Sequence, residues 1–226
     1  MTRVGLLGGS FNPAHGGHRA ISRHALRMLG LDEIWWLVSP GNPLKEAAGM
    51  APLAIRYRSA LEAARGLPIR VTAIEQELRT VYTAQTLRIL LRRYPEREFV
   101  WLMGADNLGQ FHRWRDWRGI ARRVPIAVIG RPGYDAQARA ARAMGWLRRF
   151  VRPATQARHW THWRLPALVL LQTPPDPTSA TGLRAADTDW HLRQSRSFNP
   201  QALRDRVTRR PFSPRRHIAN TRPDPA

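Results

Sequence analysis

The chain has 226 residues, a formal net charge of +21 and no cysteine, which suits one α/β domain and excludes disulfides and thiolate metal sites. It has no run of 18 or more apolar residues and no charged-then-apolar leader, so we expect a cytoplasmic protein without membrane partners. Arginine supplies 36 of its 37 basic residues and is spread along the whole length, which favours anionic substrates over a specific nucleic-acid partner.

Short apolar runs alternate with longer amphipathic stretches, and this pattern predicts βα units around a parallel sheet. The predicted strands are Val4–Leu7, Ile34–Val38, Ile69–Thr72, Phe99–Met103, Ile126–Ile129 and Ala167–Leu171. The predicted helices are His18–Leu29, Leu53–Arg65, Ala84–Arg93, Trp117–Arg122 and Ala136–Phe150. We therefore expect a Rossmann-like α/β fold, an open parallel sheet with helices on both faces.

Most of the unusual residues directly follow predicted strands, at the edge where open parallel sheets bind ligands. If the strand order is 3-2-1-4-5, the crevice lies between the first and fourth strands. The turn that holds His15 would then face the turn that holds Asp106.

The composition changes near residue 185. Residues 186–226 contain few aliphatic side chains, many Arg, Pro, Ser and Asn residues, and no sustained periodicity. Such a segment buries too little apolar area to offset the entropy of ordering it. We expect one folded domain over 1–185 and a largely disordered tail, either divergent or translated out of frame, over 186–226.

The most informative segment begins at the end of the first strand and reads GGSFNPAHGGH over residues 8–18. A strand end followed by a helix N-terminus holds phosphate well, because free backbone N–H groups and the helix dipole both point there. His15 and His18 share one face of the first turn at this spacing and could address the same anion. Either histidine alone would more simply be a helix cap or a packed side chain.

Lys45 is the sole lysine of the chain and follows the second predicted strand. A compact ammonium is not equivalent to a guanidinium, so a single lysine in a chain that otherwise uses arginine indicates a site that needs it. The alternative, an ordinary surface lysine, is nearly as good on this observation alone.

The histidine segment and the segment TSATGLR over residues 178–184 resemble the nucleotidyltransferase superfamily with HxGH and SxTxxR signatures. Within it, the sequence is most similar to the bacterial nicotinate-nucleotide adenylyltransferases. Three internal segments carry the same resemblance: residues 82–87, residues 104–114 and residues 131–134. The resemblance covers about residues 1 to 185, and five motifs in order are far more specific than HxGH alone.

The resemblance implies adenylyl transfer from ATP to nicotinate mononucleotide, giving deamido-NAD and pyrophosphate. A phosphomonoester has a second pKa of about 6, so this nucleophile needs no general base. The protein then has two tasks: to hold the substrates in line, and to stabilise charge on the transferring phosphoryl group and the leaving pyrophosphate. Asp106 is the only acid in the motif turns, so we expect Mg²⁺ to be held mainly by ATP phosphates and water.

The resemblance also implies roles for individual residues. The expected catalytic residues are His15, His18, Lys45 and Arg184. The expected ATP-binding residues are Gly8, Gly9, Ser10, Phe11, Gly104, Asp106, Ser179 and Thr181. The expected acceptor-binding residues are Asn42, Thr86, Trp114 and Arg131. Without the resemblance, these glycines, hydroxyls and the tryptophan would be a tight turn, helix caps and core.

Other functions remain open on the sequence. The chain could be an adenylyl- or cytidylyltransferase with a phosphopantetheine-type acceptor, or a nonenzymatic nucleotide- or RNA-binding protein with salt-sensitive polyanion binding. Nicotinate and nicotinamide mononucleotide are not cleanly distinguished, and the oligomeric state is not predicted. The sequence departs from many relatives at Leu44, where they have a histidine before the lysine.

Overall fold

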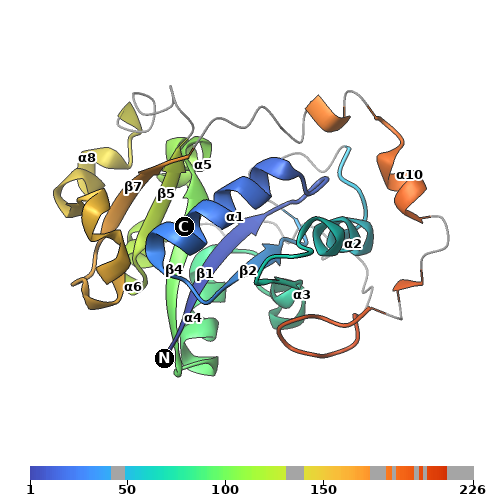
Figure 1. Cartoon of the computed structure of the whole chain (residues 1–226), viewed down its shortest axis with the longest axis horizontal. Coiled ribbons are helices and arrows are strands. Elements are labelled where there is room, and N and C mark those ends of the chain that lie inside the picture. Colours follow the sequence, from blue (N-terminus) through green and yellow to red (C-terminus); the bar gives the residue numbers. More distant parts are fainter. Residues whose placement is uncertain are drawn as a thin grey trace, which may run out of the picture.

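A seven-stranded parallel sheet in the order β3-β2-β1-β4-β5-β7-β6 forms the centre of the protein (Figure 1). The computed structural model describes residues 1–41, 49–130, 140–173, 182–184, 187–195, 199–200 and 203–212. The strands are β1 (Thr2–Gly9), β2 (Glu33–Val38), β3 (Ile69–Thr72), β4 (Arg97–Gly104), β5 (Ile126–Gly130), β6 (Val151–Arg152) and β7 (Leu168–Gln172). The predicted fold class is confirmed.

All six predicted strands are present, and the structure adds the two-residue strand β6. The predicted order is also correct: the chain places β2 and β3 on one side of β1, and β4 and β5 on the other. The order therefore reverses between β1 and β4, which are hydrogen-bonded neighbours. This is the point at which open α/β sheets form a crevice beyond the carboxyl ends of their strands.

The helices in the described ranges lie close to four of the five predicted ones. They are α1 (Gly16–Leu29), α2 (Leu53–Ala63), α3 (Ile74–Leu78), α4 (Thr83–Arg93), α5 (Ala105–Phe111), α6 (Trp117–Arg123), α8 (Met144–Leu147) and α10 (Trp190–Ser195). Two 3₁₀ helices, η1 (Arg148–Phe150) and η2 (Ala154–His162), follow α8. The predicted helix over 136–150 falls partly outside the described residues, and its remainder is α8 and η1. Within these ranges, no helix is both long and apolar enough to cross a bilayer.

Alternation along the strands sends neighbouring side chains to opposite faces of the sheet. Trp35 and Trp36 show this on β2: both are buried, Trp35 in the cluster with α4, α5 and α6, and Trp36 in the cluster with α1, α2 and η2. In Figure 1, α1 lies in front of the sheet and α4 behind it. The sheet is thus covered on both faces, as its unbroken apolar strands predict.

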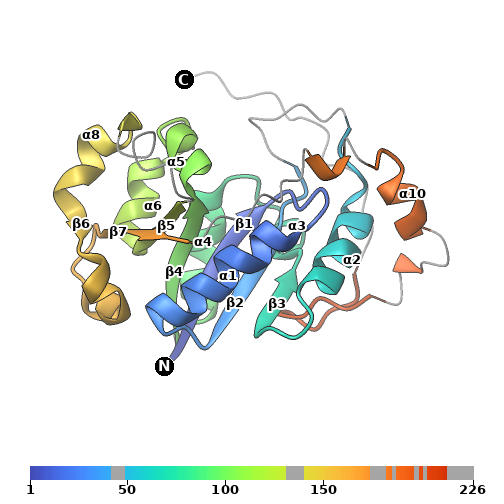
Figure 2. The ribbon, with the colours of Figure 1, turned by 45° about the horizontal axis from the view of Figure 1, so that its top comes forward.

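Part of the segment predicted to be a disordered tail packs on the domain. Residues 203–212 form a turn beside β3 (Figure 2), where the Arg206 N–H donates to the Val71 carbonyl over 3.2 Å. Phe212 is buried against Tyr57, with ring centroids 5.1 Å apart. Asp205 is also buried, and its carboxylate accepts four hydrogen bonds. One buried carboxylate and one buried aromatic ring offset the ordering entropy of this short turn, which composition alone does not reveal.

Candidate active site

The candidate site is the loop between β1 and α1, together with the strand ends beside it. β1 ends at Gly9, whose carbonyl accepts a hydrogen bond of 3.0 Å from the Ser39 N–H just after β2. On the other side β1 pairs with β4, which ends at Gly104. The loop between β1 and α1 therefore lies at the reversal of strand order, where the sequence predicts the crevice.

His15 and His18 form a reciprocal cap at the start of α1. The Gly17 N–H donates to His15 Nδ1 over 3.1 Å, and the His15 N–H donates to His18 Nδ1 over 3.2 Å. Their ring centroids are 4.0 Å apart. Because Nδ1 accepts in both rings, the neutral rings carry their protons on Nε2, which is then a donor. The cap thus sets the tautomer of both imidazoles and satisfies helix N–H groups that would otherwise lack acceptors.

Phe11 lies beneath this pair and does not face an open cleft. Its ring is 1% exposed and packs between Trp36 and His18, at centroid distances of 5.0 and 4.7 Å. Its backbone is in the left-handed region at φ 47°, a conformation that costs energy for a bulky residue. The structure therefore assigns Phe11 to supporting His18, whereas the sequence predicts that it lies beside the nucleotide.

The centre of the loop is tied to two other segments, one at residues 49–51 and one at Arg184. Asn12 is buried, and its amide group donates to the Gly49 carbonyl over 3.0 Å and accepts from the Ala51 N–H over 3.1 Å. The Asn12 carbonyl in turn accepts from Arg184 over 2.6 Å. Arg184, predicted as a catalytic cation, therefore lies against the histidine loop although 172 residues separate it from Asn12.

Arg56 is the main residue at this site that the sequence does not single out. It is 1% exposed and its guanidinium donates to four backbone carbonyls: Ala51 at 2.8 Å, Ser10 at 2.6 Å, Ser39 at 2.8 Å and Pro40 at 3.3 Å. Burial lowers the pKa of Arg56 to about 10, so the side chain stays charged at neutral pH. Arg56 thus holds the loop after β1 and the loop after β2 together. No sequence signal distinguishes it among 36 arginines.

The predicted glycines are explained by close packing inside the protein. A Cβ atom on Gly8 would lie 2.8 Å from the Trp101 ring, and one on Gly9 would lie 3.3 Å from the Phe11 ring. A Cβ atom on Gly104 would clash with Oδ1 of Asp106, which is exposed in the first turn of α5. A side chain at Gly104 would therefore displace the one acid of the predicted ATP site.

Two predicted acceptor contacts lie on the α4 side of the sheet. Thr86 is fully buried, and its hydroxyl contacts Thr80 Oγ1 at 2.8 Å and Glu75 Oε1 at 3.2 Å. Trp114 is half-buried and packs edge-to-face on Trp101, with ring centroids 6.1 Å apart. The Thr86 side chain is therefore occupied within the protein, which leaves backbone groups near it for a ligand.

Glu75 is the second residue that the sequence does not single out. It is buried, and burial raises its pKa to about 7, while hydrogen bonds from Thr86 and Ser39 act in the opposite direction. Its position shortly after the third predicted strand is the signal that could have identified it. Since Ser39 follows β2 and Thr86 lies on α4, Glu75 links the two flanks of the site.

Five of the predicted site residues lie outside the described residues: Asn42, Lys45, Arg131, Ser179 and Thr181. Of the predicted site residues that the structure describes, His15, His18, Arg184 and Ser10 lie around the loop between β1 and α1. Asp106 lies just beyond the neighbouring end of β4. Thr86 and Trp114 lie on the other face of the sheet, near its carboxyl edge.

Comparisons with known proteins agree with this geometry. The profile of the family described as cytidylyltransferase-like matches residues 6–186. A protein of Erythrobacter litoralis named "Probable nicotinate-nucleotide adenylyltransferase" is 61% identical over 208 residues, 92% of this chain and 93% of the relative. A protein of the same name from Parvibaculum lavamentivorans is 50% identical over 84% of this chain and 94% of its own length.

Solved structures agree on the fold. Plasmodium falciparum nicotinic acid mononucleotide adenylyltransferase, complexed with NaAD, superposes with a TM-score of 0.61 at 14% identity. The superposition covers 82% of this chain and 83% of that one. The 208 residues shared with the Erythrobacter protein exceed the 185 of the predicted domain, so the similarity extends into 186–226.

Proposed function

The chain belongs to the cytidylyltransferase-like family, among the nicotinate-nucleotide adenylyltransferases, and from this premise we propose that its cleft transfers the adenylyl group of ATP to nicotinate mononucleotide. The products are deamido-NAD and pyrophosphate, and the reaction is a step of NAD biosynthesis. The observation that carries the assignment to this cleft is the interlocked pair His15 and His18 at the start of α1, at the reversal of strand order.

In the proposed reaction, a phosphate oxygen of nicotinate mononucleotide attacks the α-phosphorus of ATP. A new P–O bond forms, the bond between the α-phosphorus and the bridging oxygen breaks, and pyrophosphate leaves with its electron pair. The nucleophile is already largely dianionic near neutrality, so the protein supplies positioning and charge stabilisation. His15 and His18 donate from Nε2 to phosphate oxygens, and Lys45 and Arg184 supply positive charge.

The hydrogen bonds within the cap support this role for the histidines. A ring whose Nδ1 accepts from a backbone N–H cannot rotate freely, so its Nε2 donor has a defined direction. Phe11 and Trp36 support the His18 ring from below. Donors that are fixed before the substrate arrives need little reorganisation during the reaction, and this is the main source of electrostatic stabilisation in enzymes.

We assign ATP to the strand ends around β1 and β4. Ser10, Gly104 and Asp106 line this region in the described residues, and Ser179 and Thr181 complete the proposed site. Gly8, Gly9 and Phe11 act mainly through packing that keeps this backbone in place. Mg²⁺ would be bound mainly through ATP phosphates and water, and it would offset the phosphate charge. The exposed carboxylate of Asp106 lies in the same region, where it could contact the water shell of the ion.

We assign nicotinate mononucleotide to the neighbouring region that includes Asn42, Thr86, Trp114 and Arg131. No side chain caps the N-terminus of α4, which begins at Thr83. Helix N-terminal N–H groups bind carboxylates well, and the pyridine carboxylate of the acceptor is such a group. The half-buried ring of Trp114 offers a stacking surface for the pyridine.

The first test measures pyrophosphate release with ATP and Mg²⁺ and a panel of acceptors: nicotinate mononucleotide, nicotinamide mononucleotide and phosphopantetheine. We expect the fastest turnover with nicotinate mononucleotide, because only its carboxylate suits the start of α4. Turnover with phosphopantetheine alone would reject the proposal, as would turnover with none of the three.

The second test replaces His18 with alanine. We expect kcat to fall by about 10²–10³-fold, the usual effect of removing one donor to a transition-state oxyanion. His162→Ala, an exposed histidine on η2, is the matched control and should leave kcat unchanged. Near-native circular dichroism of both variants would separate loss of chemistry from loss of fold, and retained activity in the His18 variant would remove it from the catalytic residues.

A further inference from the structure

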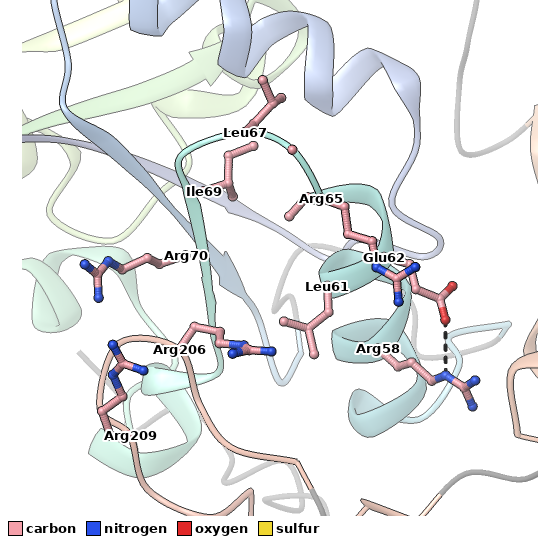
Figure 3. Close-up of a pocket in the computed structure, with 11 residues that line it drawn as sticks. Arg58, Leu61, Glu62, Arg65, Leu67, Ile69, Arg70, Arg206 and Arg209 are labelled. Atoms are coloured by element: carbon pink, nitrogen blue, oxygen red, sulfur yellow. Dashed lines mark hydrogen bonds and ion pairs between the residues drawn. The ribbon is translucent and has the colours of Figure 1, made fainter.

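A polar pocket lies away from the proposed active site, between the end of α2, the start of β3 and the turn 203–212 (Figure 3). Its volume is about 510 Å³. The charged residues that line it are Arg58, Glu62, Arg65, Arg70, Arg206 and Arg209. Five guanidinium groups against one carboxylate leave a large local excess of positive charge. The loops that Arg56 joins lie at the other end of α2.

The acidic partners near this pocket are already used. Glu62 pairs with Arg58 over 3.2 Å, and Arg70 pairs with Glu33. Arg65, Arg206 and Arg209 are exposed, and none of these three has an ion pair or a side-chain hydrogen bond to any residue that the structure describes. Three like charges around one recess repel one another, so an anion there would be stabilised by all three.

The backbone that carries these arginines is well fixed. The Arg206 N–H donates to the Val71 carbonyl and to the Tyr57 hydroxyl, each over 3.2 Å. The Arg209 N–H donates to the Asp205 carbonyl over 3.0 Å, and Arg209 has a left-handed backbone at φ 63°. On the opposite wall, the Arg65 carbonyl accepts from Arg19 over 2.8 Å. Figure 3 shows Arg206 and Arg209 on the turn and Arg65 on the α2 side. The ligand would therefore meet a recess whose walls are in place beforehand.

We propose that this pocket is a second binding site, distinct from the active site, for a small anion that contains a condensed phosphate chain. Guanidinium groups match phosphate oxygens through paired N–H donors, and arginines from two walls can bind successive phosphates. The recess is large enough for several phosphate groups and too small for a macromolecular chain to be enclosed. Inorganic polyphosphate and the polyphosphate of a nucleotide share this chemistry. The proposal does not depend on the function assigned to the cleft.

Isothermal titration of the full chain with inorganic tripolyphosphate tests the proposal. We expect the double variant Arg206→Ala/Arg209→Ala to lose one binding event that the wild-type protein shows, or to bind at that site about tenfold more weakly. The matched control is Arg148→Ala/Arg149→Ala, which removes the same charge from exposed positions on η1. This control variant should leave the affinity of that binding event within about twofold of the wild-type value. Arg65→Ala, on the other wall, should weaken the same event.

Parallel titrations with ATP distinguish the two sources of the phosphate chain. If nucleotides bind there, ATP shows one event more with the wild-type protein than with the Arg206→Ala/Arg209→Ala variant; if only free polyphosphate binds, the two ATP titrations are identical. Equal weakening of tripolyphosphate binding in both double variants would mean diffuse charge attraction and would overturn the proposal. So would a tripolyphosphate titration in which the wild-type protein and the pocket variant are identical. Pyrophosphate release by the pocket variant should stay within twofold of wild type.

Discussion

Arg56 lies wholly inside the protein without an acidic partner among the described residues, and four backbone carbonyls bind it instead. These carbonyls belong to the loops after β1 and β2 and to the segment that leads into α2. A buried carbonyl that loses its donor retains its full desolvation cost, about 1–3 kcal/mol. Removal of Arg56 should therefore affect both loops at once.

Arg56→Lys is expected to lower the free energy of unfolding by on the order of 3 kcal/mol, because one ammonium cannot reach four carbonyls in different directions. We also expect it to raise the KM for both substrates, since the loops would no longer be held together. Urea unfolding and initial-rate kinetics measure the two effects. Arg88→Lys, at an exposed position on α4, should change neither, and an unaltered Arg56→Lys protein would contradict this account.

Glu75 makes stability depend on pH. Its pKa is raised by burial from an ordinary 4.5 to about 7, so the folded protein binds a proton that the unfolded chain releases at lower pH. The stability that this proton provides is complete at low pH and is lost as the pH rises through the folded pKa. The affected window is therefore about pH 4.5 to 7.

Glu75→Gln should remove this dependence, because the amide keeps the shape and never ionises. Between pH 5 and pH 8 we expect the wild-type protein to lose on the order of 2 kcal/mol of unfolding free energy relative to the variant. Urea unfolding of both proteins at both pH values measures the difference, and groups that the two share cancel. A constant difference across pH would show that Glu75 does not titrate in this range.

At the residue scale, the sequence predicted those groups whose chemistry shows in their spacing. His15 and His18 are recognisable because three residues separate them after a glycine-rich strand end, and Arg184 because it ends a motif. Arg56 could not be predicted, because its role depends on burial and on partners in other segments. Glu75 was missed although it follows the third predicted strand, because only the fold shows that it is buried against Thr86. Phe11 was predicted to lie beside the nucleotide, and the structure adds that its ring is buried against Trp36 and His18.

At the scale of elements, long apolar or amphipathic runs were predicted well. Ile34–Val38 of β2 and Phe99–Met103 of β4 read as unbroken apolar stretches, and both are buried in the sheet. The short elements were not predicted: α3 has five residues and β6 has two, too few for a periodicity to appear. Such elements form because packing in the finished fold fixes them, not because of their own propensity.

The turn 203–212 is the clearest of these, and Asp205 should be the residue that holds it. Its Oδ2 accepts from Thr72 Oγ1 at 2.9 Å and from the Ala73 N–H at 2.7 Å, and its Oδ1 accepts from the Val207 and Thr208 N–H groups. Asp205→Ala leaves these donors without an acceptor and should cost on the order of 3 kcal/mol of unfolding free energy.

Urea unfolding measures that loss. The unfolding free energy of Asp205→Asn should lie between those of the wild-type protein and Asp205→Ala, because an amide oxygen replaces only one of the two carboxylate oxygens. Glu96→Ala, a change in an exposed ion pair with Arg97, is the control and should stay within about 0.5 kcal/mol of wild type. If Asp205→Ala were as stable as the control, the turn would not contribute to the fold.

At the scale of the whole molecule, the charge of +21 is compatible with a two-layered core, because Arg56 is the only arginine among the fully buried large side chains of the described residues and it binds backbone carbonyls. The sequence predicted the parallel sheet, since this follows from the alternation of strands and helices, and the order assumed for its first five strands is the observed one. The sequence could not predict that residues beyond 185 return to the domain. Their sequence shows no hydrophobic periodicity, and Asp205 binds partners that lie more than 130 positions earlier in the chain.

The contact between Arg206 and Val71 has a further consequence. β3 is the outermost strand on its side of the sheet, so its outward amides and carbonyls would otherwise be a template for a strand of another molecule. The returning turn occupies that position and carries arginines that repel a second copy. We therefore expect a chain that ends before this turn to be prone to self-association.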